Sequence, residues 1–129
     1  MLRTETQALL NELRAALLAT AHYRRALAPH LSASGEALRA QATEREQWSE
    51  RLAALIRASC DLPDAPDPER EAARALALRM REVFLGDQSA LAALAREDER
   101  LLTLVRRTRA AALPAEAQAL LDEMAQALA

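Results

Sequence analysis

Two charged residues interrupt the apolar stripes of predicted helices, and they are the residues best placed to form a site. Arg45 lies at the centre of one stripe and Asp98 at the centre of another. Because a charge buried alone costs several kcal/mol, each must be paired, solvated or functional. The sequence favours a buried Arg45–Asp98 ion pair. The alternative is a small polar cavity that holds an anion or polar ligand beside Trp48, with Arg24 or Gln41 contributing.

A metal centre is the other chemistry to consider. Helical bundles often become enzymes by holding two metal ions, with glutamates from two helices and Glu-x-x-His pairs from the others. Neither His22 nor His30 lies three residues after a glutamate, and in Glu44-x-x-Gln47 an amide stands at the ligand position. We therefore expect no cofactor. Iron or manganese enters only under the alternative of a degenerate metal-binding bundle, whose candidate ligands are Glu44, Glu97, Asp98 and Glu123.

Other catalytic arrangements are not indicated. Cys60 is the single cysteine and lies beside the turn Asp61-Leu62-Pro63 rather than near a base, so we expect a spare thiol and no internal disulfide. No glycine-rich phosphate loop, catalytic serine arrangement or zinc spacing occurs. The charged run 96–100 predicts a solvated face. We therefore predict no catalytic residue.

Composition predicts an all-α protein with a single domain, residues 1–129. Alanine, leucine, arginine and glutamate dominate, whereas the chain has two valines and one isoleucine. The net charge of -2 at pH 7 gives no reason to expect nucleic acid or an anionic membrane as a partner. No apolar run approaches a membrane span and no signal segment is recognised, so we expect a cytoplasmic, bacterial-type protein.

Apolar spacing and helix breakers predict four long helices and one short one. The first covers residues 4–28 with a capping box at Thr4 and Gln7, and the second ends near Ser59 as its antiparallel neighbour. A proline-rich crossover, 60–68, leads to a short third helix that begins at Asp67 and stops before Gly86. Its predicted buried residues are Leu76, Met80, Val83 and Phe84.

The last two helices are separated by the break Leu113-Pro114. Asp87 is predicted to cap the fourth helix, and the fifth begins near Ala115. The predicted stripe of the fourth helix is Leu91, Leu94, Asp98, Leu101, Leu102, Val105 and Ala112. Three further leucines lie off the main stripes and suggest an exposed apolar strip, namely Leu10, Leu18 and Leu78.

The order of short motifs along the chain resembles a bacterial ferritin-like four-helix-bundle family of unknown function. The resemblance implies a ferritin-like up-down bundle with one additional short helix in the crossover, and it implies no established activity. The chain departs from the family at His22 and Arg96, where that family usually has glycine. The motifs are His22-Tyr23, Glu44-Arg45-Glu46-Gln47-Trp48, Glu50-Arg51-Leu52, Leu85-Gly86-Asp87, Glu97-Asp98 and Leu113-Pro114-Ala115-Glu116.

These observations together predict a non-enzymatic helical bundle. We expect it to act in stress physiology through an unknown protein partner or as a homo-oligomer. A degenerate metal-binding bundle is the alternative, and a helical adaptor is a third reading. An association module needs an exposed apolar strip, whereas a metal site needs several inward carboxylates.

Overall fold

The computed structural model describes residues 4–31, 33–59, 61–64, 74 and 86–129, and the regular secondary structure within them is all helical, with no strand. These residues include four α-helices and one short 3-10 helix. The prediction of an all-α bundle is thereby confirmed. The predicted third helix lies outside the described residues, as do Cys60 and Leu78. The elements are α1 (Glu5–Leu27), η1 (Ala28–His30), α2 (Gly35–Ala58), α4 (Asp87–Arg109) and α5 (Ala115–Leu128).

The ends of the helices follow local chemistry. The capping box at the start of α1 is formed as predicted: the Thr4 hydroxyl accepts from the Gln7 amide at 3.1 Å, and the Gln7 side chain accepts from the Thr4 amide at 2.9 Å. At the start of α4 the prediction was wrong. Gly86, with φ of 92°, is the N-cap, and Asp87 is the first helical residue. Asp87 still places an acid in the first turn, where its negative charge interacts favourably with the positive end of the helix dipole.

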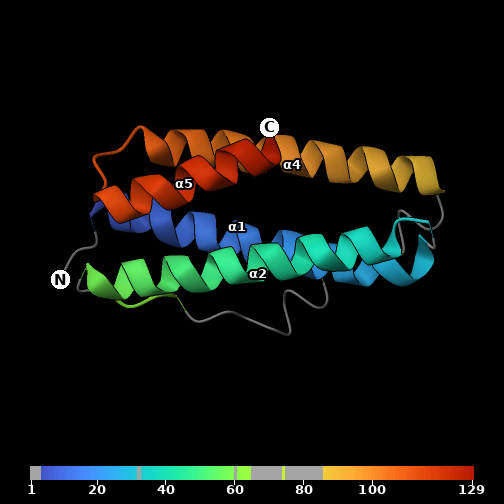
Figure 1. Ribbon diagram of the computed structural model, residues 1–129, viewed down its shortest axis with the longest axis horizontal. Coiled ribbons are helices and arrows are strands. Elements are labelled where there is room, and N and C mark those ends of the chain that lie inside the picture. The colour runs from blue at the N-terminus through green and yellow to red at the C-terminus, as the bar shows by residue number, and fades with distance from the viewer. Residues whose placement is uncertain (1–3, 32, 60, 65–73, 75–85) are drawn as a thin grey trace.

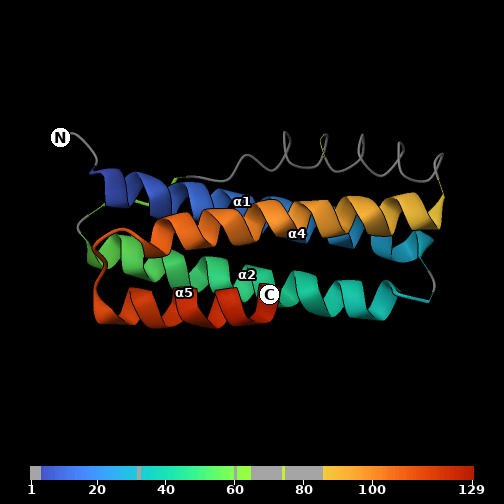
Figure 2. The same cartoon turned by 90° about the horizontal axis from the view of Figure 1, so that it is seen from above.

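The helices pair as two antiparallel hairpins that lie along each other. α1 and α2 run in opposite directions, and so do α4 and α5 (Figure 1). α2 ends at the end of the bundle where α1 begins, whereas α4 begins at the opposite end. α2 and α4 therefore run in the same direction, and the end of α2 and the start of α4 lie at opposite ends of the bundle. α1 packs against both α2 and α4, whereas α5 lies along only part of their length (Figure 2).

A layer of charged and polar side chains separates two apolar clusters inside the bundle. On α1 the layer falls between Leu17 and Leu27, and on α4 between Leu94 and Leu101. The larger cluster contains Leu10, Leu13, Leu17, Trp48, Leu52, Ile56, Leu101, Val105, Leu120, Leu121 and Met124. The smaller contains Tyr23, Leu27, Ala28, Leu31, Leu38, Ala90 and Leu94.

The burial of two leucines differs from the prediction: Leu10 is buried and Leu91 is exposed. Leu10 is only 4% exposed, because α1 contacts two helices and so buries a wider face than a single stripe. Leu91 is 45% exposed, because the first turns of α4 pack through Ala90 and Leu94 and turn Leu91 outward. Ala112 also leaves the predicted stripe, since α4 ends at Arg109. Leu18 is half-buried.

Candidate functional site

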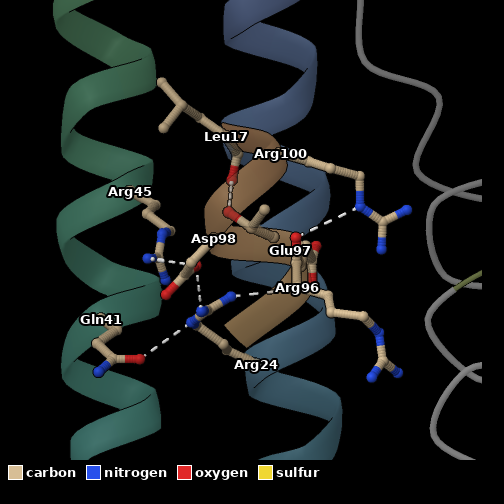
Figure 3. Close-up of polar contacts among 9 residues, drawn as sticks. Leu17, Arg24, Gln41, Arg45, Arg96, Glu97, Asp98 and Arg100 are labelled. Carbon is tan, nitrogen blue, oxygen red and sulfur yellow. Dashed lines mark hydrogen bonds and ion pairs between the residues drawn. The ribbon is translucent and has the colours of Figure 1, made fainter. Parts of the chain in front are cut away.

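The polar layer is organised around one carboxylate that two buried arginines share. Arg24 comes from α1, Arg45 from α2 and Asp98 from α4 (Figure 3). Asp98 Oδ1 accepts a hydrogen bond from Arg24 Nη2 at 2.5 Å and another from Arg45 Nη2 at 3.0 Å. The structure thus brings the predicted residues Arg45 and Asp98 together and adds Arg24 as a second partner of the same oxygen.

Two further side chains complete the layer. Gln41, one turn before Arg45 on α2, accepts from Arg24 Nε at 3.0 Å through its amide oxygen. Glu97 lies beside Asp98 on α4, and its Oε2 is 4.0 Å from Arg24 Nη1. We refer to Arg24, Gln41, Arg45, Glu97 and Asp98 as the polar layer (Figure 3).

Burial decides the electrostatics of this layer. Arg24 is 1% exposed and Arg45 3%, whereas the Asp98 side chain retains 32% of its exposure. Burial lowers the pKa of Arg45, with the positive charge of Arg24 adding to the effect. Arg45 nevertheless remains a cation, because a guanidinium does not lose its proton in proteins. Two interior positive charges are therefore held close together.

Glu97 is the titratable group of the layer. Burial raises its pKa to about 7, and the neighbouring charge of Asp98 adds to the rise, whereas Arg24 opposes it. The distance of 4.0 Å to Arg24 Nη1 is too long for a hydrogen bond, which is why the arginine does not offset the loss of water. Near neutral pH Glu97 is therefore protonated in a large share of the molecules.

The buried arginines hold more unpaired donor atoms than the layer has unpaired acceptors. Each guanidinium has five N–H donors. Arg24 Nη1, Arg45 Nε and Arg45 Nη1 are buried and have no hydrogen-bond partner among the described residues, whereas Glu97 Oε2 is the one acceptor of the layer in the same position. Buried polar groups in folded proteins are nearly always paired, so this surplus distinguishes the layer from an ordinary buried ion pair.

The four carboxylates considered for a metal do not converge. Glu97 and Asp98 are adjacent, but Glu44 is exposed on α2 and Glu123 pairs with Arg51 on the surface. Among the described residues no group of three or more histidine, cysteine or acidic side chains is placed to hold a metal ion. Two guanidiniums beside Glu97 and Asp98 also oppose a cation there by charge repulsion. The iron or manganese alternative stays a prediction.

The other residues singled out from the sequence take structural positions. Trp48 is 4% exposed and belongs to the larger apolar cluster, one turn from Arg45. His22 and His30 are exposed. The position of Arg24 on the buried face of α1 was visible in the sequence, because Leu17, Arg24 and Leu27 share one helical face.

One residue of the layer was misplaced by the sequence reading. Glu97 belongs to the charged run 96–100, for which we predicted a solvated face. Its side chain is 19% exposed, whereas Arg96, Glu99 and Arg100 are exposed as expected. The composition of the run gives no signal that one of its charges turns inward, because the direction depends on where α1 packs.

Comparisons with known protein families, with curated proteins and with solved structures give no significant match to this chain. Within the described residues, no helix is both long enough and apolar enough to cross a membrane.

Proposed function

We propose that the protein is a non-enzymatic helical bundle that acts by association, with a second copy of itself or with another protein. The observation that supports this proposal is the exposure of Leu91 on α4. Leu91 and Leu102 are three helical turns apart and share one face, and Leu102 is half-buried. An apolar stripe that begins in the interior and continues to an exposed leucine is typical of a surface that meets a partner.

Sedimentation velocity at micromolar protein concentration tests this proposal. We expect a mass above that of one chain for the wild-type protein and a shift toward the monomer for Leu91→Glu, because a buried carboxylate at an interface is strongly disfavoured. Leu62→Glu is the matched control, since Leu62 is 78% exposed and follows α2 in the chain rather than belonging to α4. A strictly monomeric wild type would end the self-association form of the proposal. Equal effects of the two substitutions would remove the role of Leu91.

The association could also be with a different protein. In that case the wild type is monomeric, and a pulldown in which Leu91→Glu loses a partner that Leu62→Glu retains would support the proposal. The proposal would be contradicted if both variants lost the same partners, or if both retained all of them. A role in stress physiology stays a prediction.

We also propose that the bundle is ferritin-like. The directions of the helices support this: α1 and α2 are antiparallel neighbours, α4 runs parallel to α2, and the start of α4 lies at the other end of the bundle from the end of α2. A ferritin-like bundle has one long crossover of this kind. A crystal structure in which residues 59–86 pass along the bundle between α2 and α4 would agree, whereas a different helix order would end this assignment.

A further inference from the structure

We propose that the buried arginine pair of the polar layer, Arg24 and Arg45, binds a small oxyanion of the phosphate or sulfate type. Both guanidiniums come to one carboxylate oxygen, Asp98 Oδ1, from two different helices. Guanidinium groups are the side chains best suited to hold oxyanions, because their planar donors form charge-assisted hydrogen bonds. The proposal rests on the contacts of the two arginines and not on association, although Asp98 lies between Leu91 and Leu102 on the same face of α4.

The net charge of the layer is positive when Glu97 is protonated, so the layer can accept an anion. Arg24 and Arg45 contribute two positive charges, and Asp98 contributes one negative charge. Glu97 forms no hydrogen bond with either arginine, its Oε2 lies 4.0 Å from Arg24 Nη1, and burial raises its pKa to about 7, so near neutral pH it supplies the second negative charge in only part of the molecules. An unpaired interior charge is costly, so binding one further anion would stabilise the folded protein.

The donor balance points to the same ligand. Within the part of the chain that the structure describes, Arg24 Nη1, Arg45 Nε and Arg45 Nη1 are buried without an acceptor. An oxyanion supplies several acceptor oxygens at once, and its charge compensates that of the guanidiniums. Water could satisfy the donors but would leave the charge uncompensated. An oxyanion site therefore predicts that added sulfate stabilises the folded protein through binding, whereas donors satisfied by water predict no such effect.

The layer can be reached from solvent. Gln41 on α2 is exposed, and the Asp98 side chain on α4 is 32% exposed, although the arginines between them are buried. Figure 3 shows that Asp98 lies between the two guanidiniums, with Gln41 beside Arg24. Because both guanidiniums are covered, an ion reaches them from this edge once the side chain of Gln41 or Asp98 moves aside.

Thermal unfolding in a titration with sulfate, at constant ionic strength set with chloride, tests the proposal. A ligand that binds the folded state raises the melting temperature along a saturating curve. Sulfate also stabilises proteins generally by exclusion from their surface, but that effect does not saturate and does not depend on one side chain. We expect a saturating rise in wild type, matched by saturable heat in calorimetry, and no such rise with chloride alone.

Variants separate a built site from general charge. Arg45→Lys keeps the charge but loses the planar donors, and we expect it to weaken sulfate binding about tenfold or more, the equivalent of one charge-assisted hydrogen bond. Arg51→Gln is the matched control, because Arg51 is an exposed arginine of the same helix that pairs with Glu123. We expect the Arg51→Gln protein to bind sulfate as the wild type does.

The pH dependence gives a readout that a merely structural pair would not show. Raising the pH ionises Glu97 and adds a negative charge that competes with the bound anion. The groups that face Glu97 are Arg24 from α1, Arg45 from α2, Asp98 on its own helix, and Arg74. We expect sulfate affinity to fall as the pH rises through about 7 and this fall to disappear in Glu97→Gln.

Two results would overturn the proposal. The first is a wild-type protein that shows no saturable heat and no saturating stabilisation at millimolar sulfate or phosphate. That result would mean that water alone satisfies the buried donors. Equal stabilisation of wild type, Arg45→Lys and Arg51→Gln would show surface exclusion rather than a site. Should Arg45→Lys fail to fold, the wild-type calorimetry and the pH dependence of Glu97→Gln still decide the question.

Discussion

Arg24 and Asp98 are 74 residues apart in the sequence and form a contact of 2.5 Å between α1 and α4. The same carboxylate oxygen is 3.0 Å from Arg45 of α2, so a single acid ties three helices together at one level of the bundle. Because the acid lies between two apolar clusters, shifting any of these helices along its axis would separate the charges. We infer that this contact fixes the register of α1, α2 and α4.

Removal of the shared carboxylate should be strongly destabilising. Asp98→Ala leaves Arg24 and Arg45 close together with no ion-pair partner at hydrogen-bond distance, and we expect the free energy of unfolding to fall by about 3–5 kcal/mol. Urea unfolding monitored by circular dichroism measures this loss. Glu99→Ala, at an exposed neighbouring position, is the control and should change stability by less than about 0.5 kcal/mol. A loss of similar size in both variants would contradict the role of Asp98.

The pairing of two arginines with one acid makes a specific prediction for combined variants. Replacing Asp98 and Arg45 together still leaves Arg24 buried without a full partner, so the double variant should recover only part of the lost stability. Replacement of all three by apolar residues, Arg24→Met, Arg45→Met and Asp98→Leu, should recover more, with coupling energies of about 1–3 kcal/mol. Additive losses across the single, double and triple variants would show that the three side chains do not interact.

Stability should depend on the protonation of Glu97. Its pKa is about 7 in the folded protein and near 4.5 when unfolded, so the folded state holds the proton more tightly. The contribution of Glu97 to the free energy of unfolding is therefore fully present below about pH 4.5. It is lost as the pH rises toward about 7, which lowers the free energy of unfolding by at most about 3 kcal/mol. Urea unfolding at several pH values, compared between wild type and Glu97→Gln, measures this difference. Parallel pH profiles for the two proteins would contradict it.

The two glycines should respond to alanine for different reasons. A Cβ at Gly35 would lie 2.6 Å from the backbone oxygen of Ala28, so Gly35→Ala should cost about 1–3 kcal/mol although alanine ordinarily favours a helix. At Gly86 the space is open but φ is 92° and ψ 171°, a region that essentially only glycine adopts, so Gly86→Ala should cost about 1–3 kcal/mol through backbone strain alone. Thermal unfolding of both variants checks this. Stabilisation by Gly35→Ala would show that the turn at Ala28 can move.

The sequence contained enough information to place most helices, because their ends depend on neighbouring residues. Thr4 and Gln7 form the predicted capping box, and the helix before Pro29 ends within one residue of its expected end. α5 begins at Ala115, directly after Pro114. Local rules failed at Asp87, where a glycine with positive φ took the capping position. These features involve contacts within one turn, which spacing alone can express.

The candidate site was only half visible in the sequence. Arg45 and Asp98 interrupt apolar stripes, and that interruption is a periodic signal that marks both as interior. The inward turn of Glu97 and the exposure of Leu91 gave no such signal, because each depends on which part of α4 faces its neighbours. The 3.6-residue period predicts which residues share a face but not how wide the buried part of that face is.

The sequence by itself therefore determined the helical class, the approximate ends of the helices and the presence of two interior charges, since these follow from local propensity and periodicity. Only the tertiary structure decided that Arg24 joins Arg45 on a single oxygen of Asp98 and that three donor atoms of the two arginines are buried without a partner among the described residues. The physical reason is distance: residues on three helices share an oxygen only once packing has set the register of those helices.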